Sequence, residues 1–260
     1  MKFSPQQDEA LKAVSRWLKA PDRQLFRLFG YAGTGKTTLA RHFAEDIDGH
    51  VQFAAFTGKA AQVLRARGAT NARTIHSLIY RPRGEEAVED ETTGKTSVSP
   101  TFSLNRQSPI AKAKLVVVDE CSMVDEELGR DLMSFGTPIL VLGDPAQLPP
   151  ISGGGYFTEH EPDHLLTEIH RQARDNPIIR LAMDVREGRE FMKGDYGTAQ
   201  VIGREDVDQD LVLSADQVLV GTNRTRRRYN QRLRELKGFD GMLPQAGDKL
   251  VCLRNDPSKG

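Results

Sequence analysis

The chain has 260 residues, of which 38% are hydrophobic and 28% are charged. These proportions are typical of a soluble globular protein and exclude a fibrous or disulfide-rich one. No apolar run approaches a membrane span, the first residues lack a signal-peptide core, and only two cysteines occur, Cys121 and Cys252. We therefore expect a reduced, cytoplasmic setting and no membrane contact. Because 36 basic residues balance 36 acidic ones, any contact with nucleic acid has to come from local clusters.

An N-terminal helix is the first predicted element. Ser4 suits its N-cap and Pro5 its first turn, and apolar residues then recur at helical spacing through Leu18. Gln7 lies in the first turn, just upstream of the motif that follows. Its amide can read an adenine edge by a bidentate contact, but a solvated glutamine on a helix explains the pattern equally well.

The strongest motif follows a predicted strand over residues 25–30. Glycines, a lysine and a threonine have the spacing G-x-x-x-x-G-K-T of a phosphate-binding loop, and a helix-compatible segment comes next. Glycines let backbone N–H groups point at phosphate oxygens, and the helix N-terminus adds a positive dipole. A glycine turn that binds nothing is the alternative, but the strand and the helix on either side argue against it. We expect a bound nucleoside triphosphate, contacted by Gly30, Ala32, Gly33, Thr34, Gly35, Lys36, Thr37 and Thr38.

Two residues of this loop have specific chemical tasks. The Lys36 amine can reach the β- and γ-phosphates, and the Thr37 hydroxyl can ligate Mg²⁺. Residues 51–56 predict a second buried strand, which ends in Thr57, Gly58 and Lys59. Strands that alternate with helices predict a parallel sheet with ligands at the carboxyl ends of its strands. The Thr-Gly-Lys segment suits a phosphate of nucleotide or nucleic acid, although a helix N-cap followed by a solvated lysine is the simpler reading.

Residues 81–108 change character. Acidic residues, a Thr-Thr-Gly-Lys turn and a Ser/Thr-rich segment form two weakly alternating arms around a glycine. This pattern predicts a protruding hairpin inserted in the sheet domain, with a disordered loop as the alternative.

A second chemical motif ends the β-branched run at 115–118. Asp119 and Glu120 follow it directly, so a buried central strand brings two carboxylates to the edge that carries the phosphate loop. We expect Asp119 to hold Mg²⁺ and Glu120 to deprotonate the attacking water. The next apolar run, 139–142, leads into a proline-rich loop in which Gln147 is placed to sense the γ-phosphate. A plain proline-rich connector explains the prolines but not a strand that ends in Gly-Asp.

The C-terminal part is more polar. A helix is predicted over 176–187, with Gly188 as its stop, and residues 188–216 read as a linker. A new strand at 217–220 then leads into a basic helix, which suggests the start of a second sheet domain. The helix carries a cluster that can grip phosphates or be a solvated face: Arg224, Arg226, Arg227, Arg228, Arg232 and Arg234.

Taken in order, these blocks resemble superfamily 1 DNA helicases of the RecD-like and Dda-like group. The resemblance rests on residues 30–38, 118–124 and 142–150 and covers nearly the whole chain. It implies that Gln7 is the glutamine that reads adenine, that Thr57, Gly58, Lys59 and His76 contact DNA, and that Arg171 reaches the γ-phosphate. For the 81–108 insert it implies a pin at the point of strand separation.

The resemblance also implies an architecture. A first RecA-like ATPase domain comprises 1–80 and 109–187, the pin subdomain 81–108, the linker 188–216, and part of a second RecA-like domain 217–260. The fold class is thus α/β, a parallel P-loop sheet domain with a small β-hairpin insert. The sequence departs from the family's pattern in three ways. Cys121 stands where the family commonly has alanine, Phe56 stands where it commonly has proline, and the chain ends at Gly260 inside the second motor domain. We therefore expect either the N-terminal portion of a longer protein or a chain that is not a complete motor.

The activity implied is ATP- and Mg²⁺-dependent movement along single-stranded DNA, 5′-to-3′ by group resemblance, with unwinding of duplex junctions in replication or repair. In this reading the catalytic residues are Lys36, Glu120, Gln147 and Arg171, and Arg224 joins the DNA contacts. One alternative is the motor subunit of a helicase–nuclease complex of the exonuclease V type. Another is a nucleotide-binding switch that moves nothing, although a pure switch has little need of a placed base such as Glu120.

Overall fold

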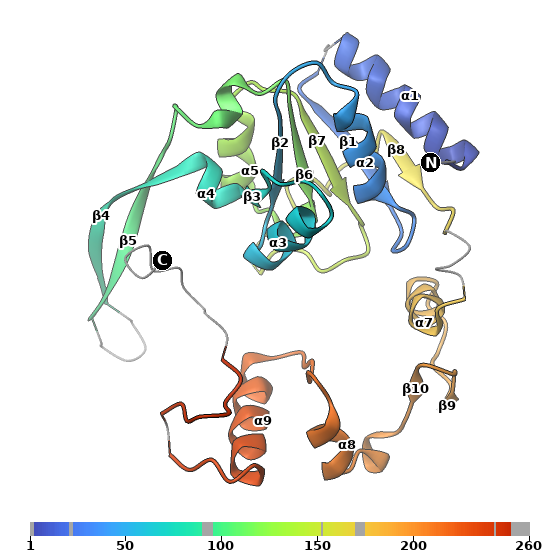
Figure 1. Cartoon of the computed structure of the whole chain (residues 1–260), viewed down its shortest axis with the longest axis vertical. Helices are drawn as coiled ribbons and strands as arrows, with labels where there is room; N and C mark the ends of the chain where they lie inside the picture. The colour runs from blue at the N-terminus through green and yellow to red at the C-terminus, as the bar shows by residue number, and fades with distance from the viewer. Residues whose placement is uncertain are drawn as a thin grey trace. The chain divides into compact units, whose positions relative to one another are not determined.

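The computed structural model describes residues 3–20, 23–89, 96–151, 153–169, 175–241 and 243–250, and gives the backbone alone for 85–89 and 96–100. The chain forms two compact units, Met1–Phe191 and Met192–Gly260. The strands of the first unit (Figure 1) are β1 Leu25–Gly30, β2 Val51–Ala55, β3 Arg73–Thr74, β4 Tyr80–Glu89, β5 Thr96–Leu104, β6 Leu115–Asp119, β7 Ile139–Gly143 and β8 His164–Leu166. Its α-helices are α1 Pro5–Lys19, α2 Lys36–Glu45, α3 Gly58–Ala66, α4 Ile75–Ile79, α5 Glu126–Met133 and α7 Pro177–Arg186, with 3-10 helices at Pro109–Lys112 and Cys121–Met123.

Six of these strands form one sheet in the order β3-β2-β6-β7-β1-β8, and every pair is parallel. The register sets Phe29 beside Gly143 and Ala55 beside Asp119. The phosphate loop after β1, the carboxylates at the end of β6 and the loop after β7 therefore leave the sheet at the same edge. This confirms the parallel P-loop sheet predicted from the strand and loop pattern.

Helices cover both faces of this sheet. Because side chains alternate along a strand, Val117 and Leu140 face a core built with α1, α2 and α3, whereas Val116 and Val141 face a second core built with α4 and α5. Figure 1 shows α2 and α3 on one side of the sheet. Burial of each such aliphatic side chain contributes roughly 1.5–3 kcal/mol, which holds the strand ends, and the site on them, in place.

The predicted hairpin is present. Strands β4 and β5 pair antiparallel from Tyr80 opposite Leu104 to Glu89 opposite Thr96, with an irregularity between Pro82 and Gly84. Figure 1 shows the two strands extending away from the six-stranded sheet. The glycine turn predicted at their tip lies outside the described residues.

The second unit differs from its prediction. It contains β9 Gly194–Asp195 and β10 Gln200–Val201, a 3-10 helix at Arg204–Asp206, α8 Gln209–Ser214 and α9 Asn223–Leu236, so part of the predicted linker has secondary structure. The helix predicted after residue 222 is confirmed, but the strand predicted at 217–220 is wrong. A strand needs a neighbour to bond its N–H and C=O groups, and no described residue of this unit pairs with that segment, where Leu219 is 85% exposed. Among the described residues no helix is long and apolar enough to cross a membrane.

Candidate functional site

The phosphate loop joins β1 to α2 in the conformation that its glycines require. Gly33 and Gly35 have φ values of +78° and +80°, in the left-handed region that favours glycine. A Cβ on Gly30 would lie 2.8 Å from both Leu166 Cβ and the Leu166 carbonyl oxygen, so no side chain fits there. Gly35 caps α2 without any side-chain hydrogen bond, which leaves the first N–H groups of the helix to an anion.

Lys36, the first residue of α2, folds back over this loop. Its Nζ donates hydrogen bonds to the carbonyl oxygens of Gly30 at 2.7 Å and Tyr31 at 3.1 Å. Burial lowers the pKa of the amine, whereas the carboxylates of Asp144, Glu120 and Asp119 act to raise it. The loop thus holds a cation facing three carboxylates, at the place where a polyphosphate would enter.

The first carboxylate pairs with the loop directly. Thr37 Oγ1 donates to Asp119 Oδ2 at 2.8 Å, and the Glu120 N–H donates to Asp119 Oδ1 at 3.0 Å. Burial raises the pKa of Asp119, and these two hydrogen bonds act to lower it. A hydroxyl and a carboxylate are oxygen ligands of the kind Mg²⁺ takes, one or two from the protein and the rest from phosphate and water. These residues therefore fit Mg²⁺, although the described residues contain no group of three or more His, Cys, Asp or Glu side chains arranged to hold a metal ion.

Glu120 adopts an unusual backbone conformation. With φ +55° and ψ +50°, it is the one described non-glycine residue in the left-handed region, a strain that costs about 1–3 kcal/mol and is typical of functional sites. Burial raises the pKa of its carboxyl, and the neighbouring Asp119 raises it further, while Lys36 and a hydrogen bond with Gln147 act to lower it. A carboxylate with a raised pKa beside the phosphate loop suits a general base.

Gln147 reaches the site from the loop after β7. The Ser122 hydroxyl donates to Gln147 Oε1 at 3.4 Å, and the Gln147 side chain hydrogen-bonds with Glu120. Asp144 shapes the turn, because its carbonyl oxygen accepts from the Gln147 N–H and its Oδ1 accepts from the Ala146 N–H, both at 3.0 Å. The structure thus brings together the amine, the two carboxylates and the glutamine that the sequence singled out.

Gln7 is not the solvated glutamine that one of the two sequence-based alternatives expected, because it is only 4% exposed. Its Nε2 donates to the Thr34 carbonyl oxygen at 3.0 Å, and its Oε1 accepts from the Ser4 N–H at 3.1 Å in a capping box. The amide therefore ties α1 to the phosphate loop, and its contact with adenine stays a prediction.

The remaining predicted residues belong to other elements or lie outside the described residues. Thr57 caps α3, its Oγ1 accepting from the Ala60 N–H at 3.1 Å, as the simpler reading of that segment expected. Lys59 is exposed on the first turn of α3, next to Gly58. Arg224 lies on α9 in the second unit, and Arg171 lies outside the described residues.

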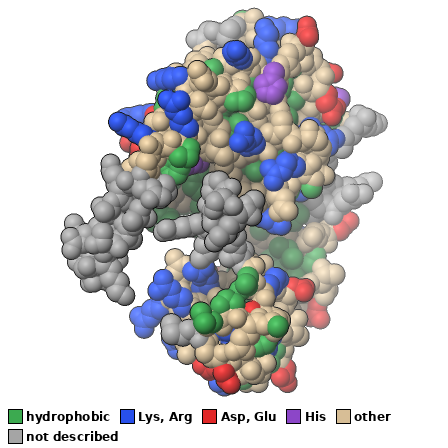
Figure 2. All heavy atoms as spheres, turned by 60° about the vertical axis from the view of Figure 1, so that its left-hand side comes forward, with side chains coloured by type: hydrophobic (Ala, Val, Ile, Leu, Met, Phe, Trp, Pro, Cys, Tyr) green, Lys and Arg blue, Asp and Glu red, His purple; other side chains and the backbone are tan. Residues whose placement is uncertain are grey.

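His76 belongs to an aromatic group that the sequence did not reveal. Its ring lies 4.4 Å from Phe102 in an edge-to-face arrangement and 4.8 Å from Tyr80. Phe102, on β5, is 43% exposed, and Arg81 and Arg83 are exposed on the paired strand β4. Figure 2 shows several separate groups of Lys and Arg side chains on the visible face of this unit. Phe102 reaches His76 only because β5 pairs with β4, so the spacing of these residues in the sequence does not indicate the contact.

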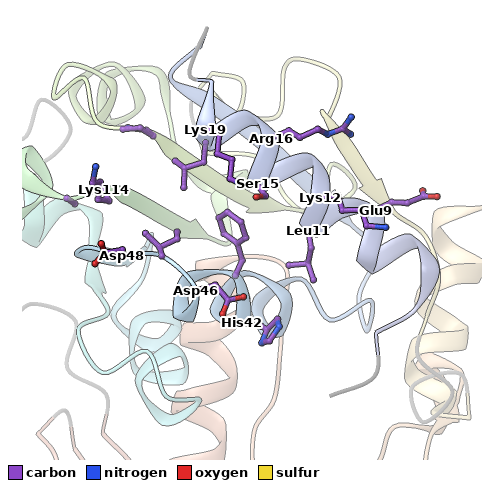
Figure 3. Close-up of a pocket in the computed structure, with 15 residues that line it drawn as sticks. Glu9, Leu11, Lys12, Ser15, Arg16, Lys19, His42, Asp46, Asp48 and Lys114 are labelled. Carbon is purple, nitrogen blue, oxygen red and sulfur yellow. The ribbon is translucent and has the colours of Figure 1, made fainter.

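A large cavity lies at the opposite edge of the sheet. It has a volume of about 1170 Å³ and is lined by residues of α1 and α2 together with Lys114 and Pro138, which precede β6 and β7 (Figure 3). Both charge signs line it, including Lys12 and Asp46. Since none of its lining residues belongs to the phosphate loop or to the ends of β6 and β7, it is separate from the nucleotide site.

Comparison with known proteins adds a family to this geometry. A family model described as an AAA domain matches residues 2–201. The chain is 33% identical over 182 residues to the ATP-dependent RecD2 DNA helicase of Deinococcus radiodurans, a match that covers 66% of this chain and 23% of that protein. It is 31% identical over 174 residues to the ATP-dependent DNA helicase dda of Enterobacteria phage T4, covering 62% of this chain and 37% of that protein. The chain thus spans well under half the length of either relative.

Solved structures agree on the fold. A Pif1 helicase from Bacteroides in complex with ADP-AlF3 and ssDNA matches all of this chain and 68% of that one, with a TM-score of 0.52 and 19% identity. A double mutant of the Bacteroides Pif1 helicase matches 89% of this chain and 56% of that one, with a TM-score of 0.51. The two sequence relatives confirm the resemblance to RecD-like and Dda-like helicases, and the family match, which spans most of the sequence, shows that the chain belongs to the AAA domain family.

Proposed function

We propose that this chain is the ATP-hydrolysing core of a DNA helicase that moves along single-stranded DNA. One observation carries the proposal: the Lys36 amine, the hydrogen-bonded pair Thr37–Asp119 and the strained Glu120 converge at one edge of a parallel sheet. The relatives from D. radiodurans and phage T4, both named as ATP-dependent DNA helicases, support it.

In this proposal the residues of the site divide the work of hydrolysis. The free N–H groups at the start of α2 bind the phosphates, and the Lys36 amine leaves the carbonyl oxygens of Gly30 and Tyr31 to contact them. Glu120 accepts the proton of the attacking water, and Gln147, hydrogen-bonded to Glu120, orients that water. Arg171 remains the proposed second cation on the γ-phosphate.

The proposed cofactor is Mg²⁺, held by Thr37 and Asp119. When bound, the ion neutralises negative charge on the phosphate oxygens. The hydrogen bond between the two side chains keeps both oxygens at the loop and holds α2 against the end of β6. Gln7 supports the same loop from α1, and recognition of the adenine ring is its proposed second task.

The proposed DNA surface lies on the elements next to the sheet. The rings of His76 and Phe102 offer a partly exposed stacking surface, and strand β4 of the same hairpin carries the exposed Arg81 and Arg83. Aromatic and basic side chains together are the means by which proteins bind single strands without sequence preference. Thr57, Gly58 and Lys59 add backbone contacts in this proposal, and the β4–β5 hairpin acts as the pin. We also propose that movement runs from 5′ to 3′. Residues 217–260 form part of a second RecA-like domain in this proposal, and Arg224 contacts DNA.

A hydrolysis assay on the full-length protein tests this function. We expect ATP turnover to rise several-fold when single-stranded DNA is added, and Lys36→Ala to abolish it at every DNA concentration. A flat response to DNA with intact turnover would contradict a motor and favour the nucleotide switch. Co-purification of a nuclease that needs this protein for activity would instead point to a helicase–nuclease complex.

A further inference from the structure

A guanidinium from outside the predicted motifs reaches the nucleotide site. Arg186 is the last residue of α7, close to the boundary at which the chain enters the second unit. Its side chain is 20% exposed and forms an ion pair with Asp144, whose side chain is 3% exposed. The guanidinium also lies over the ring of Tyr31, 4.2 Å from the centroid, in the geometry of a cation–π contact.

The two partners of Arg186 belong to the two halves of the site. Tyr31 lies in the phosphate loop, and its carbonyl oxygen accepts a hydrogen bond from Lys36 Nζ at 3.1 Å. Asp144 begins the turn that presents Gln147, with one carboxylate oxygen on the Ala146 N–H and the other on Arg186. One side chain thus fixes the position of the loop that takes the phosphates relative to the turn that senses them.

The charge of Arg186 also acts inside the site. Both Arg186 and Asp144 are near enough to Lys36 to influence its amine, the guanidinium opposing its charge and the carboxylate favouring it. If the ion pair served only to stabilise the packing of α7 against the sheet, its acidic partner could lie anywhere on the neighbouring surface. Asp144 instead lies in the turn that carries Gln147. The alternative to be tested is a bracing role of that kind, in which any loss of activity follows from a loss of stability.

We propose that Arg186 is a positioning residue for ATP hydrolysis, coupling the Gln147 turn and the phosphate loop to α7. The proposal rests on the proposed function, since it assumes that this site hydrolyses ATP. It gives α7 a task that no motif assigned to it. A shift of the Gln147 turn on γ-phosphate binding passes through Asp144 and Arg186 to the helix that leads into the second unit.

Paired substitutions in the full-length protein separate positioning from bracing. Arg186→Ala leaves the Asp144 carboxylate buried without its cation, and Asp144→Asn in the same chain removes that unpaired charge while keeping an acceptor for the Ala146 N–H. We expect Arg186→Ala to lower kcat for DNA-stimulated hydrolysis about tenfold or more, because Gln147 loses its alignment with the phosphate loop. Nucleotide affinity should stay within about twofold, because Lys36 and the loop glycines that take the phosphates are unchanged. In the double variant we expect Tm to recover and kcat to stay low.

Arg180→Ala is the matched control, because Arg180 is an exposed arginine on the same helix; its kcat should equal that of the unsubstituted protein. Normal kcat in Arg186→Ala, or recovery of kcat together with Tm in the double variant, would overturn the positioning role. Weakened binding of a non-hydrolysable fluorescent ATP analogue with normal kcat would also overturn it. Failure of the proposed function gives a different result, in which the unsubstituted protein does not turn over ATP or Lys36→Ala leaves turnover intact.

Discussion

Thr37 Oγ1 donates a 2.8 Å hydrogen bond to Asp119 Oδ2 across a sequence separation of 82 residues. The bond joins the start of α2, which follows β1, to the end of β6. Strands β1 and β6 are not neighbours in the sheet, because β7 lies between them. It is the contact by which the phosphate loop and the hydrolytic carboxylates become one site.

A pair of substitutions at Thr37 tests the role of this hydrogen-bonded pair. Thr37→Ser keeps the hydroxyl and should retain turnover within a few-fold, whereas Thr37→Val keeps the shape but removes the oxygen and should lose about 100-fold or more in kcat/KM. The physical reason is the loss of one of the two protein oxygens proposed for Mg²⁺. Turnover measured against Mg²⁺ concentration checks the prediction, and a valine variant with normal Mg²⁺ dependence would contradict it.

Lys36→Ala should reduce ATP turnover by about 100-fold or more, since it removes the cation that the loop holds ready for the phosphates. Steady-state hydrolysis measures the effect. Lys12→Ala, which removes an exposed lysine at the edge of the distant cavity, is the matched control and should leave turnover unchanged. Equal turnover in the two variants would show that the loop does not bind the reacting phosphates.

Glu120→Gln should keep nucleotide binding while kcat falls about 10²- to 10⁴-fold, the range expected for loss of a general base. Equilibrium binding of a fluorescent ATP analogue and single-turnover hydrolysis give the two readouts. If affinity is lost and the remaining bound nucleotide still reacts, Glu120 holds the substrate or its metal rather than the proton.

The raised pKa of Glu120 also predicts how stability depends on pH. Burial raises it in the folded state above the ordinary value of 4.5, so the folded chain binds more protons than the unfolded chain and stability falls as pH rises through that interval. Glu120→Gln removes the ionisable group and therefore this loss of stability at high pH. In nucleotide-free protein, the variant should therefore gain a few degrees in Tm over the unsubstituted protein at pH 8 and less at pH 4.

Thermal unfolding at the two pH values measures this gain. Glu161→Gln, at an exposed glutamate, is the control and should show no such difference. The same shift moves the acidic limb of the kcat profile upward, because the base has to be ionised to act. An acidic limb at or below pH 4.5 would contradict the assignment.

Phe102→Ala should weaken binding of single-stranded DNA by about 5- to 100-fold, which corresponds to the loss of one base stacked on an aromatic ring, roughly 1–3 kcal/mol. Phe102→Trp keeps a ring and should bind normally. Fluorescence anisotropy with an oligothymidine at fixed salt compares them. Equal affinity of all three proteins would exclude the ring group of His76 and Phe102 from the DNA surface.

The sequence predicted the parallel sheet and the position of the phosphate loop on it well, for a physical reason. Strands β6 and β7 are buried along their whole length, so each appears as a continuous apolar run, and the loop between residues 30 and 37 is local enough to be read from spacing alone. The hairpin was a near-even choice, because its arms alternate weakly and pair with each other rather than with the main sheet.

What the sequence missed depends on contacts between distant segments. Arg186 and Phe102 reach their partners only through the tertiary fold. Nothing in the sequence indicated that the Gln7 amide, buried rather than solvated, would hydrogen-bond with the Thr34 carbonyl oxygen. The strand expected at 217–220 failed because its apolar residues indicate burial only where a neighbouring strand exists to cover them.

Cys121, which follows Glu120, is fully buried, and a Cβ on Gly143 would lie 2.7 Å from its sulfur. The thiol therefore fills the space left by the absent side chain on β7, and burial raises its pKa well above the ordinary value. Such a thiol is almost entirely protonated at neutral pH and shielded from reagents. In a Cys252→Ser background, its alkylation rate would report how often the catalytic edge of the sheet opens, making the cysteine an intrinsic probe of breathing at this edge.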